Sequence, residues 1–416
     1  MQQTLVKVKQ ETEADQLKRV FVDVMIEVSK TIPQNPVIAD IDRVRLAIPH
    51  LELLSQEMLD DISNPDDNLM WAFLGVALFY QGQGQYNSAE RYCGNCLEAV
   101  QSRLGDNHPD VAQSLNNLAL LYNSQGRYTE AEPLYLEALD LYKQLLGDNH
   151  PSVALSLNNL AALYDSQGRY TEAEPLYLEA LDLRKRLLGD NHPDVANSLN
   201  NLAALYDSQG RYTEAEPLYL EALDLRKRLL GDNHPDVALS LNNLAGLYRS
   251  QGRYTEAEPL FLEALDLRKR LLGDNHPDVA NSLNNLAYLY RSQGRYTEAE
   301  PLYLEALAIA EQALGENHPH VATSLNNLAE LYRSQGRYTE AEPLYLEALA
   351  IAEQALGENH PNTIIFRENL QIMRQQQKPT SLTWWQWIIV IPIVILWMPF
   401  YLLWMLIRWL VRRFIR

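Results

Sequence analysis

The chain has 416 residues, of which 47% are hydrophobic and 21% are charged. This composition is normal for a protein that buries a core, and it excludes a chain that is disordered throughout. Acidic residues outnumber Lys and Arg by 54 to 35, and the formal net charge is −19. Because so acidic a surface repels phosphate backbones, we expect no nucleic-acid partner. The two cysteines, Cys93 and Cys96, exclude a disulfide framework.

Residues 1–65 are predicted to form a helical leader with two helices, over 15–31 and 38–62, separated by Pro33 and Pro36. The stretch IPHLELLSQEMLDDI resembles part of the leader that precedes helical repeats in bacterial signalling NTPases of the nucleotide-sensing type. The sequence contains no Gly-x-x-x-x-Gly-Lys-Ser/Thr loop to hold a triphosphate, so the NTPase itself is missing. The resemblance implies a separate signalling NTPase as a partner.

The central part of the chain is a tandem repeat. Seven His-Pro pairs recur every 42 residues, beginning at His108, His150, His192, His234, His276, His318 and His360. Six full units occupy residues 108–359, and such periodicity is typical of a stacked solenoid rather than of separate globular domains. Residues 66–107 keep the register in degenerate form and are predicted to be a first repeat. Residues 360–378 begin a seventh unit and are predicted to form a capping helix.

Each unit is predicted to be a helical hairpin. In the first full unit, apolar residues recur every three or four positions over Leu115–Tyr122 and indicate a helix, helix A, which Pro109 opens. Thr129–Glu132 then has the spacing of a capping box, which predicts the start of a second helix, helix B. Pro133 is expected in the first turn of helix B, where a missing amide costs little, and Gly147 ends the helix.

The core pattern of the unit resembles the tetratricopeptide repeat, with small residues at Ala119, Ala131 and Ala138 and large residues at Leu118, Tyr122 and Tyr135. The 42-residue length, the Asn-Asn-Leu-Ala core and the LGDNHPDVA connector resemble the kinesin-light-chain variety of that family. The resemblance covers residues 66–377. It implies an all-α, right-handed superhelical solenoid that binds a protein or peptide ligand in its concave groove.

One face of helix A varies between repeats. The units that start at His192 and His234 differ at four positions, and three of these correspond to residues 113, 120 and 123 of the first full unit. With residue 116, these positions have a 3, 4, 3 spacing that puts them on one helical face, outside the core stripe. In tetratricopeptide solenoids such a face lines the concave groove, so the resemblance implies contact with a ligand. We call these positions and their counterparts the groove face.

One position of the groove face is always asparagine, and its members are Asn116, Asn158, Asn200, Asn242, Asn284 and Asn326. A side-chain amide both donates and accepts, so this column is predicted to bind the backbone of an extended peptide whatever its sequence. Each bond contributes only about 0.5–1.5 kcal/mol, so several must act together. The alternative is that this column, or the adjacent one that begins at Asn117, forms an inter-repeat ladder that only supports the stack.

The last position of the groove face changes charge halfway along the chain and reads Asn123, Asp165, Asp207, Arg249, Arg291 and Arg333. Opposite potentials favour encounter and like charges penalise a wrong register. The gradient therefore predicts a peptide with basic residues at one end and acidic residues at the other, with drift at exposed positions as the alternative. The adjacent variable column, which includes Tyr288 and Glu330, is expected to supply side-chain pockets.

Three features that resemble chemical sites are interpreted as structural. Cys93 and Cys96 have a Cys-x-x-Cys spacing, but their register places both in a helix core and no second pair completes a zinc site. The periodic histidines lie one repeat apart, and hairpins roughly 8–10 Å apart cannot bring two imidazoles onto one zinc ion. Glutamates repeated in every unit indicate a solvated face. We expect no enzyme activity, no cofactor and no metal site.

The C-terminal tail, residues 384–416, is strongly apolar. A helix over 384–407 would be roughly 36 Å long against a hydrocarbon core of about 30 Å, so it could span a bilayer. Tryptophans and arginines that fit interfacial anchors are Trp384, Trp385, Trp387, Trp397, Trp404, Trp409, Arg408, Arg412, Arg413 and Arg416. We predict a membrane anchor. Because of Pro392 and Pro399, a re-entrant tail that ends on the membrane surface is the alternative.

The polar N-terminal stretch MQQTLVKVKQETEADQ contains no apolar core of an export signal, so we expect the repeats in the cytoplasm. Together these features predict a membrane-tethered, non-catalytic scaffold whose groove binds an extended segment of a partner protein. Two alternatives stay open. One is the sensor half of a split signalling system that acts with a separate NTPase. The other is a structural solenoid that associates with itself at the membrane.

Overall fold

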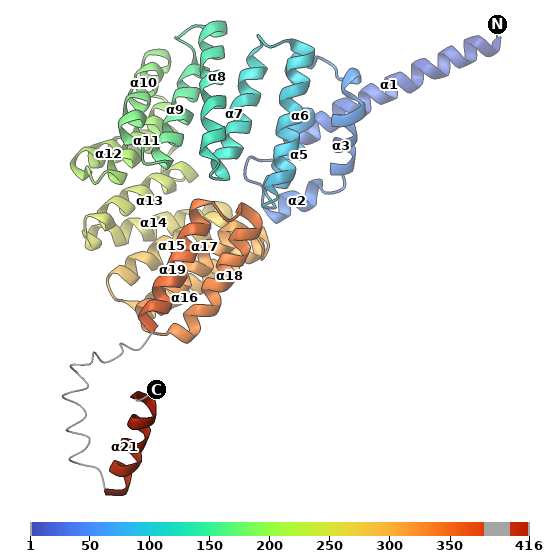
Figure 1. The fold of residues 1–416 in the computed structure, drawn as a ribbon. Coiled ribbons are helices and arrows are strands. Elements are labelled where there is room, and N and C mark those ends of the chain that lie inside the picture. Colours follow the sequence, from blue (N-terminus) through green and yellow to red (C-terminus); the bar gives the residue numbers. More distant parts are fainter. Residues whose placement is uncertain (1, 378–399, 415–416) are drawn as a thin grey trace. The chain divides into compact units, whose positions relative to one another are not determined.

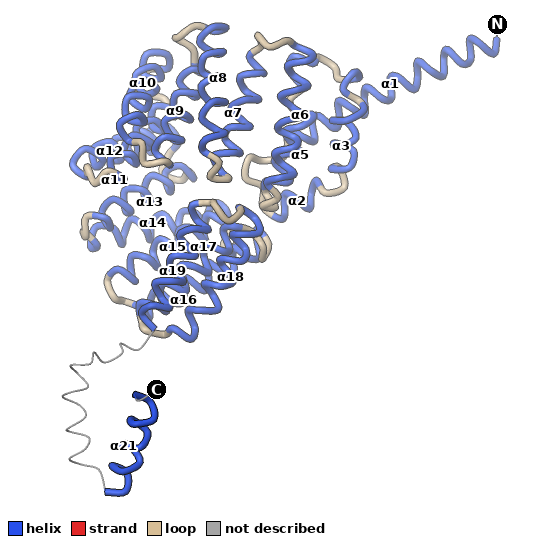
Figure 2. Tube along the Cα trace, in the orientation of Figure 1, coloured by secondary structure: helices blue, strands red, loops and turns tan. Residues whose placement is uncertain are grey.

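The computed structural model describes residues 2–377 and 400–414, and every regular element in these ranges is a helix (Figures 1 and 2). The all-α class predicted from the sequence is confirmed for this part of the chain. Two compact units are present, Met1–Leu370 and Gln371–Arg416. The first contains the leader and the full repeats as a solenoid of helical hairpins. The right-handed sense of its superhelix stays a prediction.

The six full units are hairpins of constant length. Helix A has 16 residues in every unit and is α7 (Pro109–Ser124), α9 (Pro151–Ser166), α11 (Pro193–Ser208), α13 (Pro235–Ser250), α15 (Pro277–Ser292) and α17 (Pro319–Ser334). Helix B has 19 residues and is α8 (Tyr128–Leu146), α10 (Tyr170–Leu188), α12 (Tyr212–Leu230), α14 (Tyr254–Leu272), α16 (Tyr296–Leu314) and α18 (Tyr338–Leu356). Each helix A packs against its own helix B and against helix B of the preceding unit.

The core of each hairpin alternates small and large side chains. Ala119, Ala131 and Ala138 are fully buried, and they let the helices approach closely around the buried ring of Tyr135. The same small and large positions are buried in every full unit. A unit cannot bury this stripe alone, so the stack itself completes the core.

Each His-Pro pair starts a helix A, as the sequence predicted. The proline is the first helical residue, and the histidine before it is the N-cap. Its Nδ1 atom accepts a hydrogen bond from the backbone amide two residues later, for example at 3.2 Å between His108 and Asp110. The histidine thus satisfies an amide that the helix leaves without a partner.

Helix B does not begin as predicted. It starts at Tyr128 after Arg127, and Arg127 makes no side-chain cap. The expected capping box is absent because Glu132 reaches the next repeat, where it accepts hydrogen bonds from Arg169 at 2.7 Å and Tyr164 at 3.0 Å. Pro133 is the sixth helical residue rather than a first-turn residue, and it lies exposed. There its missing amide faces solvent instead of the core.

The leader differs from its predicted form. Its first helix, α1 (Gln2–Lys30), begins before the predicted range of 15–31. The helix expected over 38–62 is broken into three pieces, which are α2 (Ile38–Val44), α3 (Ile48–Glu57) and the 3-10 helix η1 (Leu59–Asp61). The short helix α4 (Pro65–Asn68) follows them. Pro49 lies in the first turn of α3, where a proline is tolerated, whereas it would break a continuous helix. The degenerate repeat follows as α5 (Trp71–Gln81) and α6 (Tyr86–Leu104).

The solenoid brings distant parts of the sequence into contact. The Nε2 atom of His360, at the start of α19 (Pro361–Gln377), lies 3.3 Å from the carbonyl oxygen of Ser124, which is 236 residues earlier. A Cβ atom on Gly84 would lie 3.1 Å from the ring of Pro319. Helix α2 packs against α16, and Figure 1 shows it beside the last repeats. The solenoid therefore coils until hairpin turns of the early repeats contact the first residues of helices in the late repeats.

The described part of the tail is α21 (Phe400–Phe414), a helix of 15 residues. No helix within the described residues is long and apolar enough to cross a bilayer. Most of the anchor predicted over 384–407, including Trp384, Trp385, Trp387 and Trp397, lies outside the described residues.

Candidate functional site

The asparagines of the groove face are held between repeats. Asn158 Oδ1 accepts a hydrogen bond from Asn201 Nδ2 at 2.9 Å. The same bond, at 2.9–3.0 Å, joins the pairs Asn200–Asn243, Asn242–Asn285 and Asn326–Asn369. These four residues therefore take part in the inter-repeat ladder that the sequence left open as the alternative, because polar groups with little access to solvent bond to the neighbouring repeat. Peptide binding by these asparagines stays a prediction, and it must use the amide donors and acceptors that the ladder leaves without a partner.

Two asparagines of the same column are bonded differently. Asn116 Nδ2 donates to Ser156 Oγ at 3.0 Å, and Asn284 Nδ2 donates to Ser324 Oγ at 3.3 Å. The Oδ1 atoms of Asn116 and Asn284 are buried and have no hydrogen-bond partner within the described residues. A buried acceptor without a partner is costly, so these two interfaces differ physically from the rest of the ladder.

The late half of the groove face is a continuous array of aromatic and charged side chains. The ring of Tyr288 lies between two guanidinium groups, with Arg249 at 4.4 Å and Arg291 at 4.6 Å from its centroid. Glu330 then links Arg291 at 3.5 Å to Arg333 at 2.7 Å. These residues come from three successive A helices, α13, α15 and α17. The stack therefore joins the two variable columns of the sequence into one surface.

Burial perturbs the charges along this face. Desolvation lowers the pKa of Arg249, and it raises the pKa of Asp165 and of Asp207. The charge of Arg249 opposes the effect of burial at Asp207. Burial also favours the neutral form of Glu330, but hydrogen bonds from Arg333 and Tyr345 outweigh it and lower the pKa. The groove face thus holds partly desolvated charges whose interaction with a ligand would be weakly screened.

The early end of the groove face adjoins a cavity of about 310 Å³. Leu120 is 49% exposed and lines the cavity with Trp71 and Leu78. The connector between α1 and α2 forms another wall through Ile32 and Asn35. Sequence reasoning missed this cavity because its walls come from the leader, the degenerate repeat and α7, which are joined only by packing.

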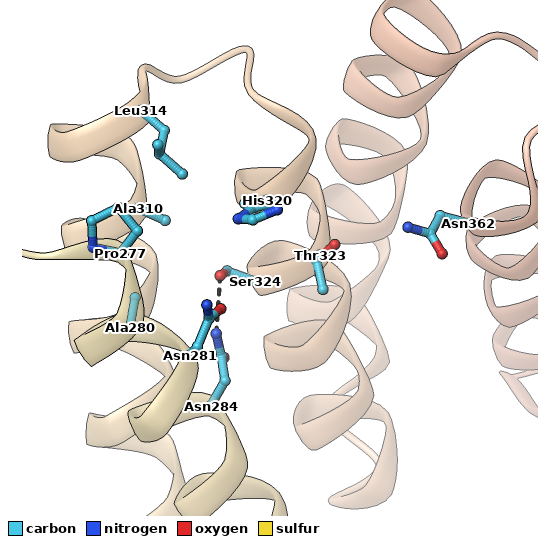
Figure 3. A pocket seen from close by; sticks show the side chains of 10 residues that line it. All are labelled: Pro277, Ala280, Asn281, Asn284, Ala310, Leu314, His320, Thr323, Ser324 and Asn362. Atoms are coloured by element: carbon cyan, nitrogen blue, oxygen red, sulfur yellow. Dashed lines mark hydrogen bonds between the residues drawn. The ribbon is translucent and has the colours of Figure 1, made fainter. Parts of the chain in front are cut away.

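A second cavity, of about 190 Å³, lies between α15, α16 and α17 (Figure 3). Figure 3 shows Asn281, Asn284, Ala310 and Ser324 around it, with the hydrogen bond between Asn284 and Ser324 drawn. His320 also lines it. Burial lowers the pKa of His320, and the nearby charge of Asp278 acts in the opposite direction. The sequence signal that could have indicated this cavity is the alanine at position 310, where the three preceding repeats have arginine.

The cysteines are packed inside the solenoid, as predicted. Cys93 and Cys96 are buried and not disulfide-bonded, and Cys96 Sγ lies 3.6 Å from Ser114 Oγ. Burial raises the pKa of each thiol to about 12, so the reactive thiolate is suppressed. His318 and His320 meet edge to face at 5.0 Å. Within the described ranges, no group of three or more His, Cys, Asp or Glu is placed to hold a metal ion.

Several solved structures have folds similar to that of this chain. A putative kinesin light chain from Podosopora anserina with nearly identical TPR-like repeats is 28% identical, covers 49% of this chain and 97% of its own, and has a TM-score of 0.41. The quorum sensor NprR from B. thuringiensis is 17% identical, with coverage of 84% and 94% and a TM-score of 0.54. A Rap protein is 16% identical, with coverage of 87% and 98% and a TM-score of 0.50.

No curated protein sequence matches this chain significantly. The family model of the tetratricopeptide repeat matches it seven times, over residues 68–144, 110–185, 153–228, 206–270, 236–312, 278–354 and 320–378. Together these matches cover well over half of the chain, and they follow the hairpins of the structure. The chain is therefore a member of the tetratricopeptide repeat family, whose fold is a non-catalytic scaffold for protein interactions.

Proposed function

We propose that the groove face binds an extended segment of a partner protein. The observation that carries this proposal is the array formed by Arg249, Tyr288, Arg291, Glu330 and Arg333, which runs without interruption across three A helices. Stacked aromatic and guanidinium groups are the side chains most enriched where proteins bind one another. An array of this length suits a ligand that extends along the solenoid rather than a compact small molecule.

The charge pattern selects the partner segment. Asp165 and Asp207 lie in the early half of the face, and Arg249, Arg291 and Arg333 lie in the late half. The ligand therefore carries basic residues near the early half and acidic residues near the late half, and the reversed peptide meets like charges. A solved Rap protein with the same fold holds Competence and Sporulation Factor, which is consistent with ligand binding by such solenoids.

The decisive experiment compares two charge-reversed variants. In the first, Arg249→Glu and Arg291→Glu reverse the centre of the array. In the control, Arg228→Glu and Arg270→Glu reverse two exposed helix B arginines, each of which is bonded to an aspartate of its own helix and to an asparagine of the preceding connector. Partners are captured from native cells with detergent-solubilised full chain and identified by mass spectrometry. Loss of one partner from the first variant only supports the groove face, whereas equal recovery by both variants contradicts it.

The same capture separates the two remaining alternatives. Recovery of a signalling NTPase, with or without the arginine substitutions, favours the sensor half of a split system. Recovery of only a second copy of this chain favours a self-associating solenoid. The experiment is repeated without residues 384–416 to show whether either result depends on the tail.

We propose further that the tail attaches the scaffold to a membrane. Supporting this, Trp404 and Trp409 of α21 are 58% and 52% exposed, with the guanidinium groups of Arg408 and Arg413 about 5 Å above their rings. Exposed tryptophan beside arginine suits the interface between headgroups and acyl chains. Full-length chain should co-sediment with anionic vesicles, and a chain without residues 384–416 should not. Equal sedimentation of both would contradict the proposal.

A further inference from the structure

One position of helix B holds a buried arginine in three successive repeats. The guanidinium Nη1 of each donates to a serine Oγ in helix A of the next repeat at 2.7–2.8 Å, in the pairs Arg184–Ser198, Arg226–Ser240 and Arg268–Ser282. It also donates to a backbone carbonyl at the start of that helix, at 3.0–3.2 Å, from Asp194, Asp236 and Asp278. The solenoid thus builds the same guanidinium site at three consecutive interfaces.

The middle copy of this site is the most complete. Besides Ser240 and the carbonyl of Asp236, Arg226 donates from Nη2 to Asn197 Oδ1 of its own repeat at 2.7 Å. All three acceptors are neutral, and they lie around a planar group with five N–H donors. The other two repeats have Leu155 and Leu239 where this one has Asn197. The asparagine is therefore an additional recognition element of the site.

At the interface that follows Arg268, the arginine is missing but the residues that would surround it remain. Ala310 stands in its place, and the 190 Å³ cavity occupies the space beside it (Figure 3). Ser324 corresponds to Ser240, Asn281 corresponds to Asn197, and the carbonyl of His320 corresponds to that of Asp236. In addition, the Oδ1 atom of Asn284 is buried at this interface without a partner in the described chain.

Two other interfaces that follow a full repeat lack this arginine, and both are filled. Tyr142 is 3% exposed and donates to Gln113 Oε1 at 3.2 Å, so its ring takes the space between the first two full repeats. After the last repeat, Phe366 takes the place of the serine and packs into the cluster that contains Ala352. Among the interfaces in the described part of the chain, only the one at Ala310 combines a small helix B residue with the serine and the asparagine.

We propose that this cavity binds the guanidinium group of an arginine side chain from the partner segment. The inference rests on the proposed function, and it adds one arginine to the ligand. This arginine lies near the start of α15 at Asn281, ten residues along the helix from Arg291, where the acidic ligand residues are expected. The partner arginine takes the place that Arg226 fills two repeats earlier, and donates to Ser324 Oγ, Asn281 Oδ1 and the carbonyl of His320. The orphaned Oδ1 of Asn284 is a fourth acceptor.

Access and charge both suit a cationic side chain. Asn281 and Asn362 are exposed at the mouth of the cavity, which adjoins a further cavity of about 260 Å³ that shares Asn281 and His320. Among the residues that the structure describes, no Lys or Arg lines either cavity. His320 is kept neutral at pH 7 by burial, which lowers its pKa, and the carboxylate of Asp278 lines the adjoining cavity.

The test uses full-length chain in detergent and radiolabelled N-acetyl-arginine amide as the probe, measured by equilibrium dialysis. We expect saturable binding at one site. The matching lysine compound should bind at least about tenfold more weakly, because a compact ammonium group cannot donate to several spaced acceptors at once as a planar guanidinium can. Ala310→Arg should abolish binding by supplying the guanidinium from within the chain. Asn281→Leu, which copies Leu239, should weaken binding by about tenfold.

A second variant shows whether the chemistry is that of the internal site. Arg226→Ala opens an equivalent space two repeats earlier, so it should add a second probe site that Ala310→Arg does not remove. Probe binding that does not saturate, or that survives Ala310→Arg in a chain with Arg226 intact, overturns the inference. If the captured partner still binds the Ala310→Arg chain at full strength while the probe does not, the cavity takes free arginine rather than a partner residue, and the groove face stands without it. If charge reversal at Arg249 and Arg291 leaves the partner bound, the proposed function fails instead.

Discussion

At the scale of residues, the most regular feature is a clamp between neighbouring repeats. Arg211 bonds Glu174 of the preceding repeat at 2.7 Å and Glu214 of its own repeat at 2.5 Å, and it lies 4.0 Å from the ring centroid of Tyr206. Equivalent clamps are centred on Arg127, Arg169, Arg253, Arg295 and Arg337. The glutamates that the sequence assigned to a solvated face therefore also join the stack. Each exposed pair contributes little, but the clamp recurs at every full repeat.

The clamp predicts a pH dependence of stability. The hydrogen bond from Arg211 lowers the pKa of Glu174 below its ordinary value of 4.5. Its contribution is therefore complete above the ordinary pKa and is lost as the pH falls through the lower, folded-state value. The urea concentration at the unfolding midpoint should decrease as the pH is lowered from 5 to 3, and this decrease should be smaller in Glu174→Gln. Glu137→Gln, at an exposed position of α8, is the control; an unchanged slope in Glu174→Gln would contradict the clamp.

A single residue also decides how the asparagine column is bonded. Where helix B supplies a buried arginine, as at Arg226, the serine opposite is occupied and the asparagine amide bonds the next asparagine. Where helix B supplies Ala310, the serine instead receives Asn284 Nδ2. The change from tyrosine to arginine to alanine at this position of helix B is visible in the sequence. Its effect on the asparagine hydrogen bonds is not visible there, because the serine, the asparagine and the arginine come from different helices and meet only in the stack.

At the scale of elements, the two helices of a hairpin begin by different means. Helix A has a side-chain cap, since His234 Nδ1 accepts from the amide of Asp236 at 3.2 Å. Helix B has none, and Thr213, which the sequence pattern would make a cap, is an exposed residue inside α12. A local capping motif was therefore overridden by inter-repeat bonding of the glutamate that it needs.

This difference predicts unequal effects of two alanine substitutions in the same repeat. His234→Ala removes an N-cap acceptor and should cost about 0.5–2 kcal/mol of unfolding free energy. Thr213→Ala should stay within about 0.5 kcal/mol of the unaltered chain. Both are measured as shifts of the urea midpoint at pH 7. An equal or larger loss of unfolding free energy in Thr213→Ala would show that Thr213 caps the helix, as the sequence pattern indicated.

At the scale of the whole molecule, the contact between the first full repeat and α19 depends on a glycine turn. Gly126 has a φ of 69°, and a Cβ atom there would lie 2.6 Å from Pro361. Gly252 has nearly the same φ, 73°, but its Cβ would meet nothing within 4 Å. The backbone turn requires glycine at both positions, whereas only Gly126 is also needed for the approach of distant parts of the solenoid.

Alanine at these two glycines should therefore separate local strain from closure. Both substitutions force a left-handed conformation on a residue with a Cβ, which costs roughly 1–2 kcal/mol. Only Gly126→Ala should also open the contact with α19. Spin labels at Thr129 and Asn359, both exposed, should report a longer distance in Gly126→Ala and an unchanged one in Gly252→Ala. The buried thiols of Cys93 and Cys96 should take up little label. Equal distances in both variants would show that the contact does not need this glycine.

The sequence by itself determined the repeat length, the two helices of each unit, the buried small and large positions, and the packed role of both cysteines. These features follow from periodicity, because a repeated pattern fixes how each unit meets its neighbours. Tertiary structure alone decided which asparagines are engaged, where the stack leaves a cavity at Ala310, and that Ser124 meets His360. The asparagine bonding and the cavity depend on which side chains of neighbouring helices meet at one interface. The contact between Ser124 and His360 depends on the small rotation added at each repeat. That rotation accumulates over the stack, and no local pattern of residues encodes it.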